Sequence, residues 1–177
     1  MNPKLIVIDA LDGVGKTTVG HLLAQELNCV FWNTPGPMLR TLSPQILSCL
    51  KDSQLAKCLF YAASVLSVGQ QAKELLDSGT SVIIDRYWLS TISYARARGV
   101  YTDLCSVEES IIKPDISIIL ELSEKDRQAR LYSRGMTSCD FETLDPRFRN
   151  TVWNEMRKYR SNGLGPTHII NTDGMTS

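Results

Sequence analysis

An excess of charge of one sign is the first thing this sequence lacks. Its 177 residues include 19 Lys plus Arg and 19 Asp plus Glu, so no net charge attracts nucleic acid or an anionic membrane. No apolar run approaches the roughly 18 residues of a membrane-spanning helix, and Met1 to Lys4 lack the apolar segment of a secretory signal. We therefore expect a cytoplasmic protein with neither a nucleic-acid partner nor a membrane partner.

Paired cysteines are missing as well. The sequence has five cysteines, an odd number, and no CxxC pair, so it indicates neither a zinc site nor a disulfide framework. A chain of this length forms one domain of ordinary size and is too short for two. Because no repeat, low-complexity tract or linker interrupts it, we expect residues 1–177 to form a single domain.

What is present is an alternation of short apolar runs with longer helical stretches. The runs are rich in Val, Ile or aromatic residues and have the length of buried strands. They are Leu5 to Asp9, Val30 to Trp32, Val82 to Asp85, Ile116 to Leu120 and His168 to Ile170. This alternation predicts a doubly wound α/β fold with a parallel sheet, and ligands at the carboxyl ends of its strands.

Two of the helical stretches have apolar residues spaced by three and four, so we expect each set to share one helical face. The sets are Val19, Leu22, Leu23 and Leu27, and Leu55, Leu59, Ala62, Ala63 and Leu66. The second helix should reach Asp77, where Ser78 and Gly79 stop it. Residues 98–107 and 134–146 are polar gaps long enough to form mobile loops.

The stretch DALDGVGKTT, residues 9–18, follows the first predicted strand and opens the first predicted helix. It fits a relaxed Walker A motif, with Ala10 where the first glycine usually stands. Gly13 and Gly15 let backbone N–H groups turn inward around phosphate oxygens, and the helix that starts near Lys16 adds its positive end. An ordinary strand-to-helix turn with a solvated lysine is the alternative, which the placement of the motif disfavours.

The motif predicts a site for ATP and magnesium. Lys16 can reach the β- and γ-phosphates, and Thr17 offers a hydroxyl to Mg²⁺. Asp85 ends a buried strand, where a carboxylate that holds the metal would lie beside the phosphate loop. Arg86 is a bidentate fork for an anion, although such an Asp-Arg pair can also be a structural ion pair. The residues expected at the ATP site are Ala10, Leu11, Asp12, Gly13, Val14, Gly15, Lys16, Thr17 and Thr18.

Taken together, these segments resemble the thymidylate kinase family of nucleoside monophosphate kinases over about the whole chain. The residues that carry the resemblance are Leu11-Asp12-Gly13 with Gly15-Lys16-Thr17-Thr18, Asp85-Arg86-Tyr87 with Ser90 and Tyr94, Pro114-Asp115, Arg127, Arg130, Arg134, Phe141-Glu142, Val152, Tyr159, and Ile169 to Asp173. Asp85 to Ala95 and Arg134-Gly135-Met136 look closest to a branch described as UMP-CMP kinase-like.

The resemblance implies a P-loop NTPase fold, a three-layer α/β/α domain with a five-stranded parallel sheet and a small lid at about residues 134–146. It implies transfer of the ATP γ-phosphate to a pyrimidine nucleotide, with dTMP the leading acceptor, and a homodimer. Thr172 and Asp173 would lie on the adenine side. Arg40 would replace an arginine that the family often has before the proline at Pro35. The expected acceptor contacts are Asp12, Arg40, Phe60, Ser64, Arg86 and Tyr94, with Tyr61 as the alternative to Phe60 for stacking on a pyrimidine.

Three arginines precede the expected lid. Arg127, Arg130 and Arg134 are separated by three and four residues, so they share one helical face. Like charges on one face repel each other, and a solvated basic face is the plain interpretation. Beside a phosphate loop, however, several positive groups can stabilise the charge that develops on a transferring phosphoryl group. We therefore predict that these arginines are catalytic, together with Lys16 and Arg86.

Other functions stay open at this point. The family usually has a thymine-reading arginine where this chain has Val65, so another pyrimidine nucleotide such as CMP, UMP or dCMP is the first alternative. A deoxynucleoside kinase needs a base for its neutral hydroxyl acceptor and typically shows Glu-Arg-Ser where this chain has Asp85-Arg86-Tyr87. A nucleotide-binding regulatory module is the third alternative, although the Asn-Lys-x-Asp motif of guanine-binding switches is absent.

Overall fold

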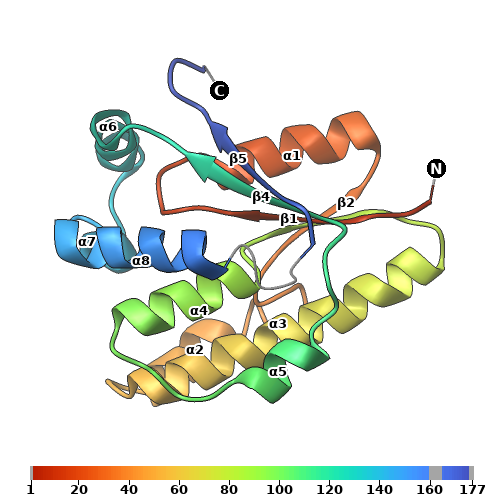
Figure 1. The fold of residues 1–177 in the computed structure, drawn as a ribbon, viewed down its shortest axis with the longest axis horizontal. Helices are drawn as coiled ribbons and strands as arrows, with labels where there is room; N and C mark the ends of the chain where they lie inside the picture. The colour runs from red at the N-terminus through yellow and green to blue at the C-terminus, as the bar shows by residue number, and fades with distance from the viewer. Residues whose placement is uncertain (1, 160–164, 176–177) are drawn as a thin grey trace.

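A parallel five-stranded sheet forms the centre of the molecule (Figure 1). The structure is a computed structural model that describes residues 2–159 and 165–175. The strands are β1 (Leu5–Asp9), β2 (Val30–Asn33), β3 (Val82–Asp85), β4 (Ile116–Glu121) and β5 (Thr167–Asn171). They lie in the order β2-β3-β1-β4-β5, and every pairing is parallel. The predicted α/β class and parallel sheet are confirmed.

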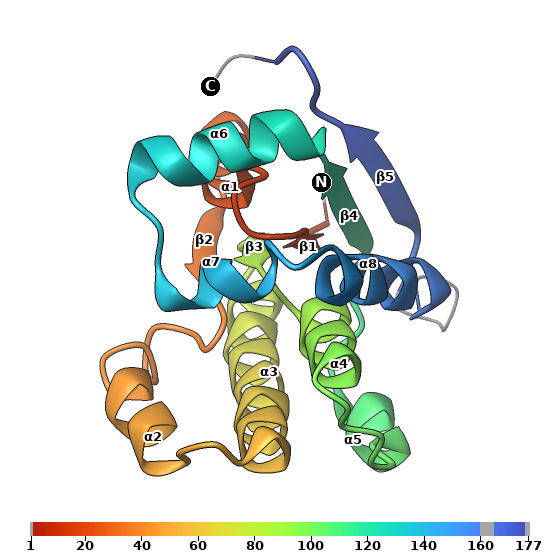
Figure 2. The same ribbon diagram turned by 90° about the vertical axis from the view of Figure 1, so that its left-hand side faces the viewer.

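Helices cover both faces of this sheet, with α1 on one face and α3 and α4 on the other (Figures 1 and 2). The helices in the described part are α1 (Lys16–Leu27), α2 (Ser43–Cys49), α3 (Gln54–Asp77), α4 (Trp88–Ala97), α5 (Cys105–Ser110), α6 (Glu124–Arg134), α7 (Ser138–Glu142) and α8 (Pro146–Tyr159). The result is the three-layer α/β/α arrangement. None of these helices is long and apolar enough to cross a lipid bilayer.

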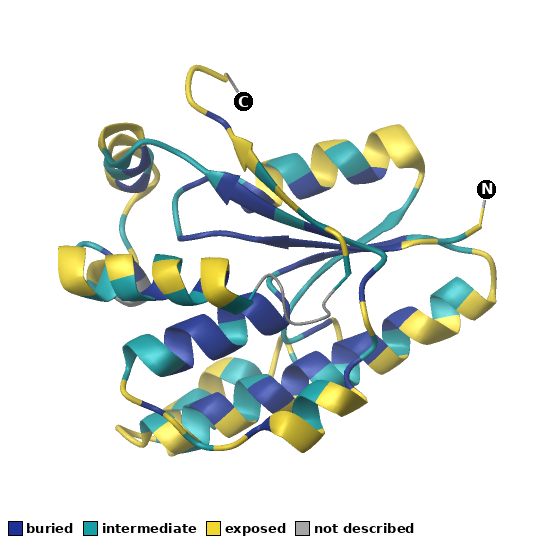
Figure 3. Ribbon diagram, viewed as in Figure 1, coloured by how far each residue is buried: buried dark blue, intermediate teal, exposed yellow. Residues whose placement is uncertain are grey.

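The central strand β1 is apolar on both sides because each side meets a layer of helices. Leu5 and Val7 belong to the core cluster that includes α3 and α4, whereas Ile6 and Ile8 cluster with Ala24 of α1. Burying each such aliphatic side chain stabilises the fold by about 1.5–3 kcal/mol. Figure 3 shows the outcome, with buried residues in the central strands and on the inner helix faces, and exposed residues on the outer helix faces and on the edge strand β5.

The predicted core face of α1 is partly wrong. Leu22 and Leu27 are 53% and 51% exposed, whereas the other two members of the predicted set pack against the core. The buried positions of the helix include Gly20 and Ala24. An added Cβ at Gly20 would lie 2.2 Å from the ring of Phe31 in β2. Small residues form this contact because the helix lies too close to β2 for a leucine.

The predicted core face of α3 is also partly wrong. Leu55, Leu59 and Ala63 are exposed, because the helix carries two apolar stripes and spacing alone does not say which one meets the core. The stripe that does so consists of Cys58, Ala62, Val65, Val68 and Ala72. The predicted end of the helix at Asp77 is confirmed, and Gly79 follows with a φ of +91°.

The two polar gaps predicted as loops each contain a short helix. Helix α5 begins at Cys105, inside the gap of residues 98–107. Helix α7 occupies part of residues 134–146, and its start is fixed by a reciprocal cap between Thr137 and Asp140. Helices α6 and α7 stand at the carboxyl ends of the strands (Figure 2), which is where the sequence predicted the ligands.

Candidate active site

The loop between β1 and α1 has the conformation that a phosphate cradle requires. Gly13 and Gly15 have φ values of +84° and +105°, which favour glycine. Gly15 precedes α1, whose first N–H groups receive no side-chain cap and stay available to an anion. Ala10 is buried and is not among the described residues with positive φ. Its methyl group therefore costs no backbone strain.

Lys16, the first residue of α1, is buried in this loop. Its Nζ donates a hydrogen bond to the carbonyl oxygen of Leu11 at 2.9 Å. Burial, and then the charge of Arg86, lower the pKa of the Lys16 ammonium from 10.5 to about 8, against the opposing effect of nearby carboxylates. The ammonium is still mostly protonated at pH 7, and a polyphosphate at this position would compensate its buried charge and raise its pKa again.

A carboxylate and a hydroxyl meet beside the loop. Thr17 Oγ1 donates to Asp85 Oδ2 at 2.6 Å, and Asn33 Nδ2 lies 3.3 Å from the same oxygen. Asp85 Oδ1 is buried and has no hydrogen-bond partner in the described part of the chain. Mg²⁺ prefers one or two carboxylate or hydroxyl oxygens together with substrate phosphates. This pair of residues therefore fits the magnesium that the sequence predicted.

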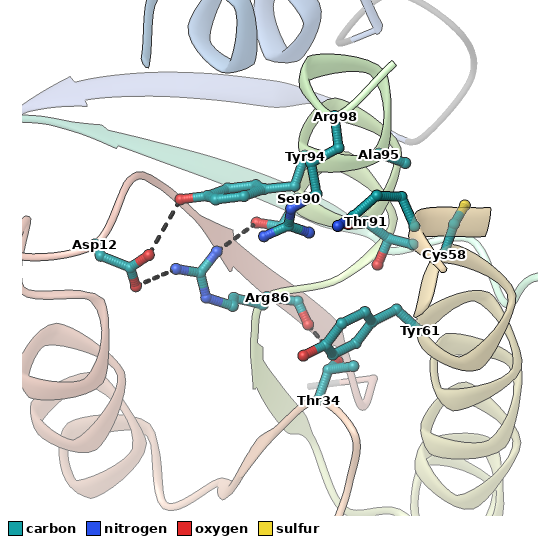
Figure 4. Close-up of a pocket in the computed structure, with 11 residues that line it drawn as sticks. Asp12, Thr34, Cys58, Tyr61, Arg86, Ser90, Thr91, Tyr94, Ala95 and Arg98 are labelled. Carbon is teal, nitrogen blue, oxygen red and sulfur yellow. Dashed lines mark hydrogen bonds and ion pairs between the residues drawn. The ribbon is translucent and has the colours of Figure 1, made fainter. Parts of the chain in front are cut away.

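Arg86 follows β3 in a left-handed conformation, with φ of +68°. Its guanidinium forms an ion pair with Asp12 and lies 3.4 Å from Ser90 Oγ (Figure 4). Tyr94 donates its hydroxyl to the other oxygen of Asp12 at 3.2 Å. Burial alone would raise the pKa of Asp12, but Arg86 and Lys16 hold it far below its usual value. The carboxylate therefore stays ionised at every physiological pH.

Asp9, at the end of β1, is a residue that the sequence analysis missed as part of the site. Its Oδ1 accepts the N–H groups of Tyr87 at 3.0 Å and Ser90 at 3.1 Å, at the start of α4. Burial raises the pKa of this carboxyl, against the lowering effect of those hydrogen bonds. It fixes the turn that carries Arg86. The sequence feature that could have identified Asp9 is an acidic residue at the end of an otherwise apolar strand.

Two cavities meet at this network. The first, of about 300 Å³, is lined by Asp12, Thr34, Gln54, Cys58, Tyr61, Arg86, Ser90, Thr91, Tyr94, Ala95 and Arg98 (Figure 4). The second, of about 470 Å³, is lined by Asp12, Gly13, Gly15, Lys16, Thr17, Thr18, Asn33, Thr34, Asp85, Arg86, Arg130, Ser133 and Arg134. Asp12, Thr34 and Arg86 line both, so a phosphate-binding cavity and a more apolar cavity share one arginine.

Three residues predicted to contact the acceptor do not line either cavity. Arg40 is exposed. The Phe60 ring contacts the Tyr61 ring edge-on, with 5.3 Å between the two ring centroids, and it is Tyr61 that lines the first cavity. Ser64 is buried and donates to the carbonyl oxygen of Phe60 at 2.7 Å. For Phe60 and Ser64 the reason is that the face of α3 that meets the first cavity is one residue away from the expected one. The acceptor contacts of all three residues stay predictions.

The three arginines of α6 have different surroundings. Arg130 donates to the carbonyl oxygens of Val14 at 3.0 Å and Met175 at 3.2 Å. Arg134 is paired with Asp140 at 2.6 Å. Both line the second cavity. Arg127 is 1% exposed and lines neither cavity, so the structure does not bring it into the phosphate-binding cavity with the other two.

The two residues predicted on the adenine side use their side chains within the protein. Thr172 Oγ1 donates to the carbonyl oxygen of Glu121 at 2.8 Å, and Asp173 Oδ1 accepts the N–H of Ser123 at 2.6 Å. Asp173 also lines a third cavity of about 340 Å³, which Leu11 and Val14 of the phosphate loop border. The segment that contains Thr172 and Asp173 is therefore attached next to the phosphate loop.

A glycine-rich loop before a helix, a hydroxyl and carboxylate pair beside it and an arginine shared with a second cavity define a P-loop phosphotransferase. The family model for thymidylate kinase matches residues 8–171. The chain belongs to the thymidylate kinase family, and it is an ATP-dependent nucleoside monophosphate kinase.

Individual proteins of this family are similar over most of their length. The thymidylate kinase of Baumannia cicadellinicola is 31% identical over 196 residues, which covers 100% of this chain and 90% of that protein. The solved thymidylate kinase of Candida albicans has a TM-score of 0.76 at 21% identity and covers 99% of this chain and 86% of its own. That of Ehrlichia chaffeensis has a TM-score of 0.73 at 22% identity, with 97% and 92% covered. These two structures confirm the fold.

Proposed function

We propose that this kinase transfers the γ-phosphate of ATP to dTMP and forms dTDP. The observation that carries the proposal is the meeting of the two cavities at Arg86. The second cavity, called the phosphate cavity below, has the phosphate loop on its wall. The first, called the acceptor cavity, has the size and aromatic lining that suit a nucleotide base. Relatives at about 30% identity carry the name thymidylate kinase, which supports thymine as the base.

On the donor side, the amides of residues 10–18 and the ammonium of Lys16 bind the ATP phosphates. Thr17 and Asp85 would hold Mg²⁺, which would neutralise negative charge on the ATP phosphates. The hydrogen bond between Thr17 and Asp85 supports this assignment. So does Asp85 Oδ1, which is buried without a hydrogen-bond partner in the described part of the chain. The Lys16 ammonium exchanges the carbonyl oxygen of Leu11 for a phosphate oxygen.

On the acceptor side, Arg86 binds the phosphate of the nucleoside monophosphate. Asp12 and Tyr94 lie beside it and contact the sugar, and the Tyr61 ring is available to stack on the base. The attacking phosphate oxygen is already ionised at pH 7, so the site needs no general base. Its task is to bring donor and acceptor into line and to neutralise charge.

The lid completes the site. Arg130 and Arg134 already line the phosphate cavity, and we assign to them the stabilisation of the transferring phosphoryl group. Closure of residues 134–146 would exclude water and limit hydrolysis of ATP. We further propose a single kinase domain over residues 1–177, a homodimer and a cytoplasmic location.

One observation favours a second candidate, a kinase for another pyrimidine nucleotide. Val65, at the position where the family usually has a thymine-reading arginine, is fully buried in the core and does not line the acceptor cavity. The edge of the base is therefore left to uncharged groups such as Thr91 and Gln54 and to Arg98, which is paired with Glu142. This set discriminates less strongly between pyrimidines than a buried arginine does.

An acceptor panel tests the proposal. The purified protein is incubated with ATP and Mg²⁺ and with dTMP, dUMP, dCMP, CMP, UMP, thymidine or no acceptor, and ADP formation is measured. Turnover highest with dTMP supports the proposal, and turnover highest with CMP, UMP or dCMP supports the second candidate. Turnover only with the bare nucleoside, or hydrolysis that no acceptor stimulates, would refute both. The variant Lys16→Ala controls for contaminating kinases.

A further inference from the structure

Arg127 has a hydrogen-bond acceptor for every one of its side-chain N–H groups, and the reaction as outlined does not use it. Its Nε donates to Glu124 Oε2 at 2.7 Å. Its Nη1 donates to the carbonyl oxygen of Asp12 at 2.9 Å and to Thr143 Oγ1 at 3.0 Å. Its Nη2 donates to Glu124 Oε1 at 2.8 Å and to the carbonyl oxygen of Thr143 at 2.9 Å. All five N–H groups of the guanidinium are thus occupied.

These acceptors come from three separate segments. Glu124 is the first residue of α6, Thr143 directly follows α7, and Asp12 belongs to the phosphate loop. Glu124 precedes residues 134–146, the segment that we assign to the lid, and Thr143 lies near the end of that segment. One buried guanidinium therefore connects the start of α6 and the later part of the lid to the main chain of the phosphate loop.

The connection continues from Asp12 to the acceptor site. The carbonyl oxygen of Asp12 accepts from Arg127, while its carboxylate pairs with Arg86 and accepts from Tyr94. The main chain and the side chain of one residue are thus held by different partners. A shift of the Asp12 carbonyl would move the carboxylate that aims Arg86 into the acceptor cavity.

We propose that Arg127 is a positioning residue that couples the base of the lid to Arg86 through Asp12. It holds the acceptor arginine in place and does not touch the transferring phosphoryl group. The inference rests on the proposed function, because it needs Arg86 to bind the acceptor phosphate. It replaces the catalytic role that the sequence predicted for Arg127.

A lysine at this position is the sharpest perturbation. It keeps the positive charge but offers three donors at one point, so it cannot span acceptors in three segments. Misplacement by about 1 Å of a group that orients a substrate can lower catalytic efficiency about 100-fold. We expect Arg127→Lys to raise the acceptor KM about 10- to 100-fold and to change the KM for ATP by less.

The chain offers a matched control in Arg149. Arg149 Nη1 also bonds Glu124, at 3.0 Å, but forms no hydrogen bond or ion pair with the phosphate loop within the described residues. Arg149→Lys should leave the acceptor KM within about twofold of the wild type, since it disturbs only the shared carboxylate. The melting temperature of each variant is measured alongside, so that loss of folded protein is corrected for.

A double-mutant cycle tests the route of the coupling. In an Asp12→Ala background the carboxylate that aims Arg86 is gone, so Arg127→Lys should change the acceptor KM by less than about threefold. Additive effects of the two substitutions would overturn the proposal. So would an Arg127→Lys variant that lowers kcat with both KM values unchanged, as a direct catalytic role predicts, or one that only melts earlier, as a purely structural role predicts.

A milder variant covers the case in which Arg127→Lys does not fold. Thr143→Val keeps the shape of the side chain but removes the hydroxyl that accepts a hydrogen bond from Arg127 Nη1, the nitrogen that also donates to the Asp12 carbonyl oxygen. Loss of one such hydrogen bond should raise the acceptor KM about 2- to 10-fold, and an unchanged KM would overturn the proposal. A wild-type enzyme without acceptor turnover refutes the proposed function itself, whereas these variant-to-wild-type ratios refute the coupling alone.

Discussion

Replacement of Lys16 by methionine should stabilise the protein without nucleotide and abolish its activity. Methionine has nearly the same length and no charge, so it fills the same buried position without a desolvation cost. Lys16 as a whole residue is 6% exposed, and its ammonium donates a hydrogen bond to the carbonyl oxygen of Leu11. Its burial is useful only when ATP is bound, because the polyphosphate then compensates the charge.

The magnitude follows from the pKa. Burial, followed by the effect of Arg86, lowers the pKa of Lys16 from 10.5 to about 8. At about 1.4 kcal/mol per pKa unit, the charged form costs the folded state about 3 kcal/mol at neutral pH. Loss of the hydrogen bond to Leu11 removes about 1 kcal/mol. Lys16→Met should therefore raise the free energy of unfolding by about 2 kcal/mol.

The pH dependence has a defined sign. Between pH 8 and pH 10.5 the unfolded chain keeps a proton on Lys16 that the folded protein has lost. The stability of the wild type therefore rises with pH across this window, relative to a variant without the lysine. The advantage of Lys16→Met is full below pH 8, shrinks as the pH rises and disappears above about pH 10.5.

Thermal or denaturant unfolding without nucleotide measures the effect. For a chain of this size, 2 kcal/mol corresponds to a rise in melting temperature of about 4–8 °C. The exposed Lys73, paired with Asp77 on the surface of α3, gives the control, because Lys73→Met should not stabilise. A Lys16→Met variant that melts at or below the wild-type temperature, or an advantage independent of pH up to 10.5, would refute the reasoning.

Three further predictions concern the acceptor, the metal and the core. Arg86→Ala should raise the acceptor KM about 10- to 100-fold and the KM for ATP far less, whereas Arg40→Ala, at an exposed position, should change neither; equal effects of Arg86→Ala on both constants would contradict its assignment. Asp85→Asn should raise the Mg²⁺ concentration for half-maximal rate at least about tenfold, and an unchanged Mg²⁺ titration would count against the site. Gly69→Ala would place a Cβ 2.5 Å from the hydroxyl of the buried Tyr87, so the free energy of unfolding should fall by about 1–3 kcal/mol. Adding Tyr87→Phe to the same chain should restore part of this stability, and failure to do so would exclude the clash as the cause.

The strands and the phosphate loop were predictable because local sequence decides them. A strand buried on both faces must be apolar throughout, and β1 and β3 occupy the residues that the pattern predicted. The positive φ values of Gly13 and Gly15 likewise follow from the motif. The proximity of Thr17 and Asp85 was also predictable, because the parallel pairing of β1 and β3 brings the carboxyl ends of these strands together.

The faces of the helices were not predictable in the same way. A helix such as α3 has apolar residues on more than one face, and the choice depends on which partner it meets. That choice put Tyr61 rather than Phe60 at the acceptor cavity and buried Val65. Asp9 escaped notice for a related reason, since its hydrogen bonds go to Tyr87 and Ser90, about 80 residues away.

The sequence by itself determined the fold class, the phosphate loop and the arginine that follows β3, because each of these depends on residue types at short, fixed spacing. Only the tertiary structure decided the roles of the three arginines in α6. Their spacing is that of a single face, yet Arg127 is buried among acceptors from three segments while Arg130 and Arg134 line the phosphate cavity. A guanidinium takes its role from the acceptors around it, and those acceptors are brought together only when distant segments pack.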